Sequence, residues 1–308
     1  MAITAKDIAD LRAKTGIGMM ECKKALTEAN GDMDEAIKIL REKGLAVAAK
    51  KADRIAAEGK VDIKLSADGK KAAIVEINCE TDFAAKGDKF LAFADKVLDI
   101  ILDKNPADVD ALLAEKYDAD NTVDDILKKE IINTIGENIS IRRFRVVEGV
   151  VASYVHGGGT IGVIVKAETS CADVDAVKGV LKNVALQIAA MNPKYLGKED
   201  VPASVIEEEK NILMTQIQND EKNANKPAQI IEKMVAGKIG KFYDTNCLMF
   251  QEYVKDDAKK VAEYVADEAK ALGGDIKVCE FLRFEKGEGI EKKEDDLADE
   301  VAKLAGLK

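Results

Sequence analysis

The same succession of patterns occurs twice along this chain, and it is the feature that most restricts the fold. Alternating apolar residues over 61–65, a turn, and an apolar run over 72–77 predict a β-hairpin. Residues 150–156 and 161–167, joined by a glycine-rich turn, predict a second hairpin. After each hairpin come Glu-Thr-Asp or Glu-Thr-Ser and a segment with the periodicity of a helix. We therefore expect an α+β fold with two related subdomains built on antiparallel sheets.

The N-terminal segment reads as three short helices. Thr4 can cap the first, which should stop at Thr15, and the second should end at the Asn30-Gly31 pair. A third begins at Asp32 and should stop at Gly44. Because a unit this small buries little surface, it is expected to be a compact docking module. The stretch 45–58 is expected to be a helical connection, and helical periodicity also runs from 109 to 135 before Gly136.

A change of pattern marks an insertion at residues 202–240. Two apolar-periodic helices joined at Asn225-Lys226-Pro227 predict an antiparallel coiled-coil hairpin. Beyond it we expect a strand over 278–284 and a terminal amphipathic helix over 295–304. The predicted division is an N-terminal module (1–54), a first core subdomain (55–149), a second core subdomain (150–201 and 241–289), the hairpin (202–240) and a small helical C-terminal module (290–308).

Charge and residue counts exclude several classes of function. A formal charge of −10 would repel a phosphate backbone, so nucleic acid is not an expected partner. No stretch is apolar enough to span a membrane and the N-terminus lacks a targeting pattern, so we expect a cytoplasmic protein. The five scattered cysteines predict reduced, structural thiols. With one histidine, the usual metal-ligand spacings are absent, and we expect neither a metal nor a cofactor.

The only motif typical of an enzyme is Gly157-Gly158-Gly159-Thr160-Ile161-Gly162, which fits G-x-G-x-x-G. A dinucleotide site needs a helix directly after the glycines, whereas a strand pattern follows here. We therefore interpret the motif as a hairpin turn and do not expect an enzyme. His156, just before it, is equally consistent with a polar strand end and with a binding residue.

Two sites carry apolar side chains of uncertain placement. Phe83 follows Glu80-Thr81-Asp82 at the end of a strand, and its position alone favours a buried anchor under the loop over a protruding contact residue. Met19 and Met20 are adjacent at a helix start. Because neighbouring helical positions point about 100° apart, one should be buried and the other exposed.

Six blocks of sequence resemble the bacterial elongation factor Ts family. They occur in the family's order and span nearly the whole chain. In single letters they read TGIGMMECKKALTEANGDMDEAIKILREKG, EINCETDF, TIGENISIRR, HGGGTIGV, KPAQIIEKMVAGKIGKF and RFEKGEGIEKKEDDLADEV. The resemblance implies a ubiquitin-associated-like (UBA-like) N-terminal module, a two-part core, the coiled-coil hairpin and a C-terminal module. It also implies the partner, elongation factor Tu, whose GDP release the protein would promote.

The resemblance also implies partner-contact residues. The Thr81-Asp82-Phe83 segment would enter the nucleotide-binding domain of elongation factor Tu and displace its magnesium ion, with Ala84, where the family commonly has Val, included only as part of the loop. Ile135 and Gly136 would contact the same domain. Further contacts are implied at Arg12, Met19, Met20 and Lys23 of the N-terminal module, at His156, and at Val254, where this chain departs from the usual family segment.

An alternative function remains open from the residues themselves. The small helical N-terminal module would also suit a non-catalytic protein-binding adaptor. The sequence likewise leaves open whether the hairpin mediates dimers or a 2:2 complex with the partner.

Overall fold

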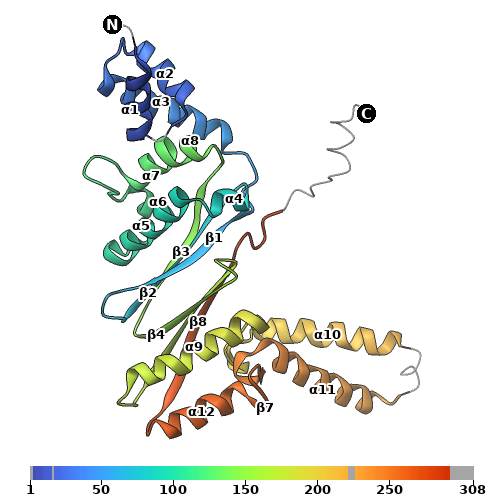
Figure 1. Cartoon of the computed structure of the whole chain (residues 1–308). Helices are drawn as coiled ribbons and strands as arrows, with labels where there is room; N and C mark the ends of the chain where they lie inside the picture. The colour runs from blue at the N-terminus through green and yellow to red at the C-terminus, as the bar shows by residue number, and fades with distance from the viewer. Residues whose placement is uncertain (1–2, 16, 221–225, 292–308) are drawn as a thin grey trace.

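Two sheets packed face to face form the centre of the computed structural model (Figure 1). The structure describes residues 3–15, 17–220 and 226–291, so the helix expected at 295–304 lies outside the described residues. The mixture of helices and antiparallel sheets confirms the α+β class. In the described part, no helix is both long and apolar enough to cross a membrane.

Three helices form the N-terminal region: α1 (Ala5–Thr15), α2 (Met19–Glu28) and α3 (Met33–Lys51). Thr4 caps α1 as expected, since its hydroxyl accepts the Asp7 N–H at 3.2 Å. The predicted stop at Gly44 is wrong, because α3 continues through it to Lys51. A Cβ at Gly44 would lie 2.6 Å from the Lys129 carbonyl oxygen. The glycine therefore permits close helix packing and does not end the helix.

The first sheet has the order β1-β2-β3, from β1 (Glu58–Leu65), β2 (Lys71–Cys79) and β3 (Ser140–Glu148). The hairpin β1–β2 confirms the prediction, whereas β3 was not anticipated. One face is covered by α5 (Asp88–Lys104), α6 (Val109–Ala114), α7 (Val123–Ile126), the π-helical turn η1 (Leu127–Ile131) and α8 (Ile132–Ile135). The periodicity over 109–135 is thus not one helix. An isolated bridge between Lys116 and Thr122 interrupts it.

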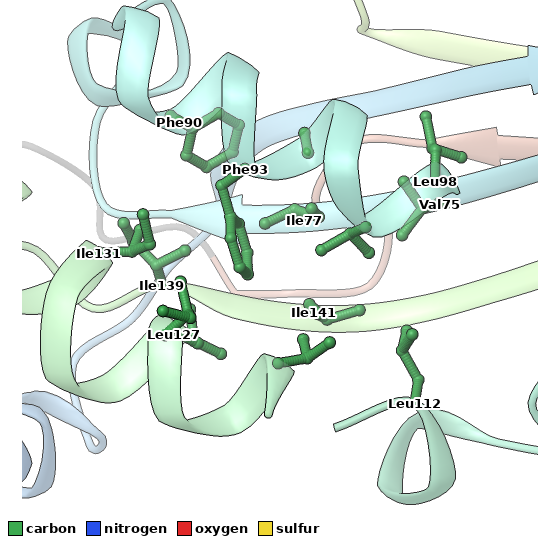
Figure 2. Packing of buried hydrophobic residues seen from close by; sticks show 14 of the residues in the cluster. Val75, Ile77, Phe90, Phe93, Leu98, Leu112, Leu127, Ile131, Ile139 and Ile141 are labelled. Atoms are coloured by element: carbon green, nitrogen blue, oxygen red, sulfur yellow. The ribbon is translucent and has the colours of Figure 1, made fainter. Parts of the chain in front are cut away.

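Apolar side chains of these helices and of β2 and β3 fill the first core (Figure 2). Phe90 and Phe93 of α5 are 0% and 1% exposed and point onto the strands. Alternate residues of β2 divide between two cores. Val75 and Ile77 face the helices, while Ile74 faces the second sheet.

The second sheet repeats this plan with the order β4-β5-β8, from β4 (Val150–His156), β5 (Ile161–Thr169) and β8 (Ile276–Glu285). Its outer face is covered by α9 (Val174–Met191) and α12 (Val261–Ala271). The predicted hairpin, helix and late strand are confirmed. Between α9 and α12 the chain forms two 3-10 turns, η2 (Lys198–Asp200) and η3 (Leu248–Phe250), and a small ribbon, β6 (Glu252–Tyr253) with β7 (Asp256–Lys260).

The glycine-rich motif is a turn between β4 and β5, as predicted. Gly157, Gly158 and Gly159 all have positive φ. A Cβ at Gly159 would lie 2.3 Å from Lys60 Cγ, and one at Gly162 would lie 2.5 Å from Val61 Cγ1. These glycines therefore let the turn and the start of β5 approach β1 of the other sheet, which explains the motif without a phosphate.

A buried carboxylate joins the two sheets. Glu76 of β2 is fully buried and accepts hydrogen bonds from Arg142 Nη1 at 3.0 Å and Arg143 Nε at 2.6 Å. A register shift opposite Glu76 and Ile77 accommodates both arginines on one partner. The Gly287 N–H, which follows β8, donates to the same carboxylate at 2.8 Å. The end of β8 is thereby fixed to the first sheet.

Helices α10 (Ala203–Asn219) and α11 (Ala228–Asn246) project away from the sheets (Figure 1). They bury a cluster of their own, made of Leu213, Ile217, Val235 and Ile239. The apolar seam expected between the two helices is therefore present. Helix α11 continues beyond the expected end at 240 to Asn246, whose carbonyl accepts the N–H groups of Lys194 and Tyr195 at the base.

Candidate partner-binding site

Phe83 lies on a one-turn helix, α4 (Asp82–Ala85), directly after the central strand β2. Its side chain is 83% exposed, so the buried anchor favoured by its position is wrong. Phe83 is exposed because the two residues that follow it face the first core. Ala84 and Ala85 pack against the first core, and the helix turn then directs Phe83 to the opposite side. An exposed phenylalanine at the end of a rigid strand is a candidate contact residue.

The backbone of α4 is fixed at its start by Thr81. The Thr81 hydroxyl accepts the Ala84 N–H at 3.2 Å, which makes Thr81 the N-cap. The same hydroxyl donates to Glu137 Oε1 at 2.6 Å. The segment expected to be a loop is therefore a capped helical turn, and its orientation is set by a residue 56 positions away along the chain.

Two glutamates connect this turn with the segment that follows α8. Glu137 Oε2 accepts the N–H groups of Glu80 and Thr81, both at 3.0 Å. In return, Glu80 Oε1 accepts the Asn138 N–H at 2.6 Å. These reciprocal bonds bring Ile135 and Gly136, the other residues implied to contact the same partner domain, to the same end of the first sheet as Phe83. Gly136 has φ +86° and ends α8 in the left-handed region.

The end of α3 joins the same network. Asn138 Nδ2 donates to the Arg54 carbonyl at 2.7 Å, and Lys51 Nζ donates to the Gly136 carbonyl. Arg54 Nη1 lies 3.4 Å from Glu80 Oε1. Three segments that are far apart in the sequence therefore meet beside the turn that carries Phe83: the exit of β2, the segment after α8 and the end of α3.

An ion pair between Asp82 and Lys86 lies on the turn beside Phe83. Asp82 accepts a hydrogen bond from Lys86 at 2.6 Å, which lowers the pKa of the Asp82 carboxyl, so a negative charge lies beside Phe83 at neutral pH.

Cys79, the last residue of β2, supports the start of the turn, because its Sγ donates to the Thr81 carbonyl at 3.1 Å. Burial raises the pKa of the Cys79 thiol to about 12, with the Glu137 charge adding to the effect. Cys79 is thus a neutral structural group.

Met19 and Met20 are 49% and 68% exposed, so the prediction that one of them is buried is wrong. Cys22, Ala25 and Leu26 supply the buried face of α2 instead. Neither methionine belongs to the apolar cluster that these residues form with α1 and α3. Together they present a polarizable apolar surface that can adapt to a partner.

The remaining candidate residues are also on the surface. Arg12 of α1 and Lys23 of α2 are exposed on the N-terminal region. His156 is exposed at the end of β4, where Nδ1 lies 3.0 Å from the Tyr154 hydroxyl. Val254, between β6 and β7, is 45% exposed, and its N–H donates to Gln187 Oε1 at 2.8 Å. Among the candidate residues, those that the hydrogen-bonded network brings together are on the Phe83 turn and the Ile135–Gly136 segment. The other candidates occupy separate places along the molecule.

Sequence reasoning missed Glu80, Glu137 and Asn138, which hold these segments together. Their signal was present, because Glu80 precedes Thr81 in one quoted block and Glu137-Asn138 follows Gly136 in another. Nothing in either block shows that the two meet in space. All five cysteines are free, as predicted, and four of them are buried.

A family model described as elongation factor TS matches residues 80–288. A protein named elongation factor Ts from Clostridium perfringens (strain ATCC 13124) is 50% identical over 308 residues, which cover 99% of each chain. Proteins of the same name from Clostridium botulinum (strain Alaska E43) and Trichlorobacter lovleyi are each 49% identical, over 99% and 100% of both chains.

Proposed function

The chain belongs to the elongation factor Ts family, and we propose that it promotes the release of GDP from elongation factor Tu without making or breaking a bond. In this proposal the Thr81-Asp82-Phe83 turn enters the nucleotide-binding domain of the GTPase. Phe83 fills a pocket there, and the magnesium ion that bridges protein and phosphate is displaced.

The observation that carries the proposal is the exposure of the Phe83 ring on a turn that is itself fixed. A phenylalanine that is 83% exposed leaves apolar surface in water, and the fold gains little from it. A partner pocket would recover that free energy. Because the turn is capped and hydrogen-bonded to Glu137, the ring would enter with little loss of conformational entropy.

Linkage explains how such contacts accelerate exchange. If the inserted turn and the nucleotide compete for the same arrangement of the GTPase, each weakens the binding of the other by the same factor. GDP then leaves through a ternary complex, and fresh nucleotide later releases the exchange factor. The charge of Asp82, close to Phe83, would further disturb a site organised around a magnesium ion.

The other segments would divide the remaining contacts. We assign residues 1–54 to a UBA-like docking module, in which Arg12, Met19, Met20 and Lys23 contact the GTPase. Residues 55–149 and the pair 150–201 and 241–289 would form the two halves of the core, with His156 and Val254 meeting further parts of the GTPase. Residues 202–240 would form a coiled-coil hairpin available for dimer formation, and 290–308 a C-terminal module. The protein would act in the cytoplasm with its partner.

The test is the release of a fluorescent GDP analogue from purified bacterial elongation factor Tu. Addition of the protein should accelerate release in proportion to its concentration until the partner is saturated. If the folded protein at saturating concentration leaves the rate unchanged, the proposed function is wrong.

A protein-binding adaptor is the second candidate, and the exposed Met19 and Met20 favour it because they form an apolar surface independent of Phe83. Capture of partners from a bacterial lysate separates the two functions. Elongation factor Tu should be the main protein retained if exchange is the function, and it should be minor if the protein is an adaptor.

A further inference from the structure

Glu137 holds the Phe83 turn from outside its own chain segment. Its carboxylate accepts three hydrogen bonds, from the N–H groups of Glu80 and Thr81 at 3.0 Å each and from the Thr81 hydroxyl at 2.6 Å. The donors come from consecutive residues at the exit of β2, and the acceptor follows α8. Both elements lie at the same end of the first sheet (Figure 1).

The two N–H groups need this acceptor. Glu80 and Thr81 come between the end of β2 at Cys79 and the first turn of α4, so their N–H groups belong neither to the sheet ladder nor to the helix. Hydrogen bonds to an ionised acceptor are stronger than those between neutral groups. The Glu137 carboxylate therefore restrains the backbone that carries Phe83.

The bond in the opposite direction extends the restraint to the second contact segment. Glu80 Oε1 accepts the Asn138 N–H at 2.6 Å, so the turn and the segment after Gly136 cannot shift independently. The Phe83 turn and the Ile135–Gly136 segment, which we propose contact one domain of the partner, are thereby held at a fixed spacing. Loss of that spacing would impair insertion even where each surface is intact.

We propose that Glu137 is a positioning residue for nucleotide exchange, which it supports by holding Phe83 and the Ile135–Gly136 segment in the arrangement that enters the GTPase. This inference rests on the proposed exchange function. Its consequence is kinetic. First docking depends on other surfaces and should survive removal of Glu137, whereas displacement of GDP within the complex should slow.

The experiment compares three variants with the unaltered protein. Glu137→Ala removes all three acceptor contacts. Glu137→Gln is the conservative variant, because its amide oxygen can still accept the two N–H groups. Glu148→Gln is the control, since Glu148 lies at the far end of β3 and pairs on the surface with Lys71 at 2.7 Å. For each, GDP release is measured over a range of concentrations of GDP-bound elongation factor Tu, together with the melting temperature.

For Glu137→Ala we expect kcat to fall about tenfold or more with KM changed less than about threefold, since a lost hydrogen bond to a charged group typically costs that much. Glu137→Gln should recover most of kcat, and Glu148→Gln should match the unaltered protein. A merely structural role would instead lower the melting temperature and the fraction of folded protein, and would leave kcat per folded molecule unchanged. Equal kcat for Glu137→Ala and the unaltered protein overturns the proposal.

A double-mutant cycle supplies the decisive comparison. If Glu137 acts by placing Phe83, then Glu137→Ala should have little further effect on kcat in a Phe83→Ala background. Fully additive effects overturn the positioning role while leaving the exchange function intact. If the unaltered protein itself fails to accelerate release, the proposed function is overturned and the positioning role with it.

Discussion

Truncation of Phe83 separates a contact residue from a core residue more sharply than any other change in this chain. Phe83 retains 83% of its surface in solvent, so less than a fifth of the residue is covered by the protein. Full burial makes Phe→Ala cost about 3–5 kcal/mol, and scaling by the covered fraction leaves about 1 kcal/mol or less for Phe83→Ala. The melting temperature should therefore fall by about 4 °C at most.

Phe90→Ala is the matched control, because Phe90 is the same residue type, seven positions along the chain, and fully buried in the first core. Its truncation should cost the full amount of about 3–5 kcal/mol and lower the melting temperature by about 6 °C or more. The two variants thus remove the same atoms from opposite environments.

Exchange activity should show the reverse order. Removal of a contact aromatic at a hot spot costs about 2 kcal/mol or more, which is about thirtyfold in stimulated GDP release by Phe83→Ala. Phe90→Ala should retain normal activity per folded molecule at temperatures well below its transition. Melting is followed by circular dichroism and release by a fluorescent GDP analogue on elongation factor Tu. The reasoning is refuted if Phe83→Ala melts as early as Phe90→Ala and exchanges normally while folded.

Four further predictions concern the projecting helices, Cys79 and the two N-terminal methionines. Replacing residues 206–240 by a short Gly-Ser linker should leave the circular dichroism transition of the remainder cooperative, because the removed helices bury their own apolar cluster; loss of the folded state would show that they belong to the core. Cys79 should resist a thiol reagent in the native protein at pH 8 while the partly exposed Cys279 reacts, and a modified Cys79 would contradict the burial argument. Because folding raises the pKa of Cys79 to about 12, the unfolded chain loses the thiol proton above about pH 9 while the folded protein keeps it. The free energy of unfolding measured by urea titration should therefore decrease between about pH 9 and pH 12. Serine at both Met19 and Met20 should raise KM for GDP-bound elongation factor Tu several-fold at nearly constant melting temperature, and an unchanged KM would remove these residues from the interface.

Much of the architecture was predictable because it is encoded locally. Alternation over 61–65, the strand pattern over 150–156 and the turn residues between strands predicted both hairpins, and helical periodicity predicted α5 and α9. The glycine-rich turn at 157–159 was also recognisable from the strand pattern that follows it. Each of these features depends on neighbours within a few residues along the chain.

Strand β3 could not be predicted from the local sequence pattern. Residues 140–148 contain Arg142, Arg143 and Arg145 among apolar residues, so the strand does not alternate cleanly. Two of these arginines are accommodated only because Glu76 of β2 lies opposite them with a register shift. The charge that weakens the strand pattern is compensated by a residue 66 positions away along the chain.

The sequence by itself thus determined the α+β class and the type of the elements with a clear local pattern, which are the two hairpins, the N-terminal helices, α5 and α9, because backbone hydrogen bonding and side-chain periodicity act over short separations. Only the tertiary structure decided which side chains are covered. Gly44 continues a helix because Lys129 packs against it, Met19 and Met20 are both exposed because other residues fill the core, and Phe83 faces solvent because Ala84 and Ala85 face inward. Burial and partner contacts depend on segments that meet in space from distant positions, and a local pattern carries no information about which segments those are.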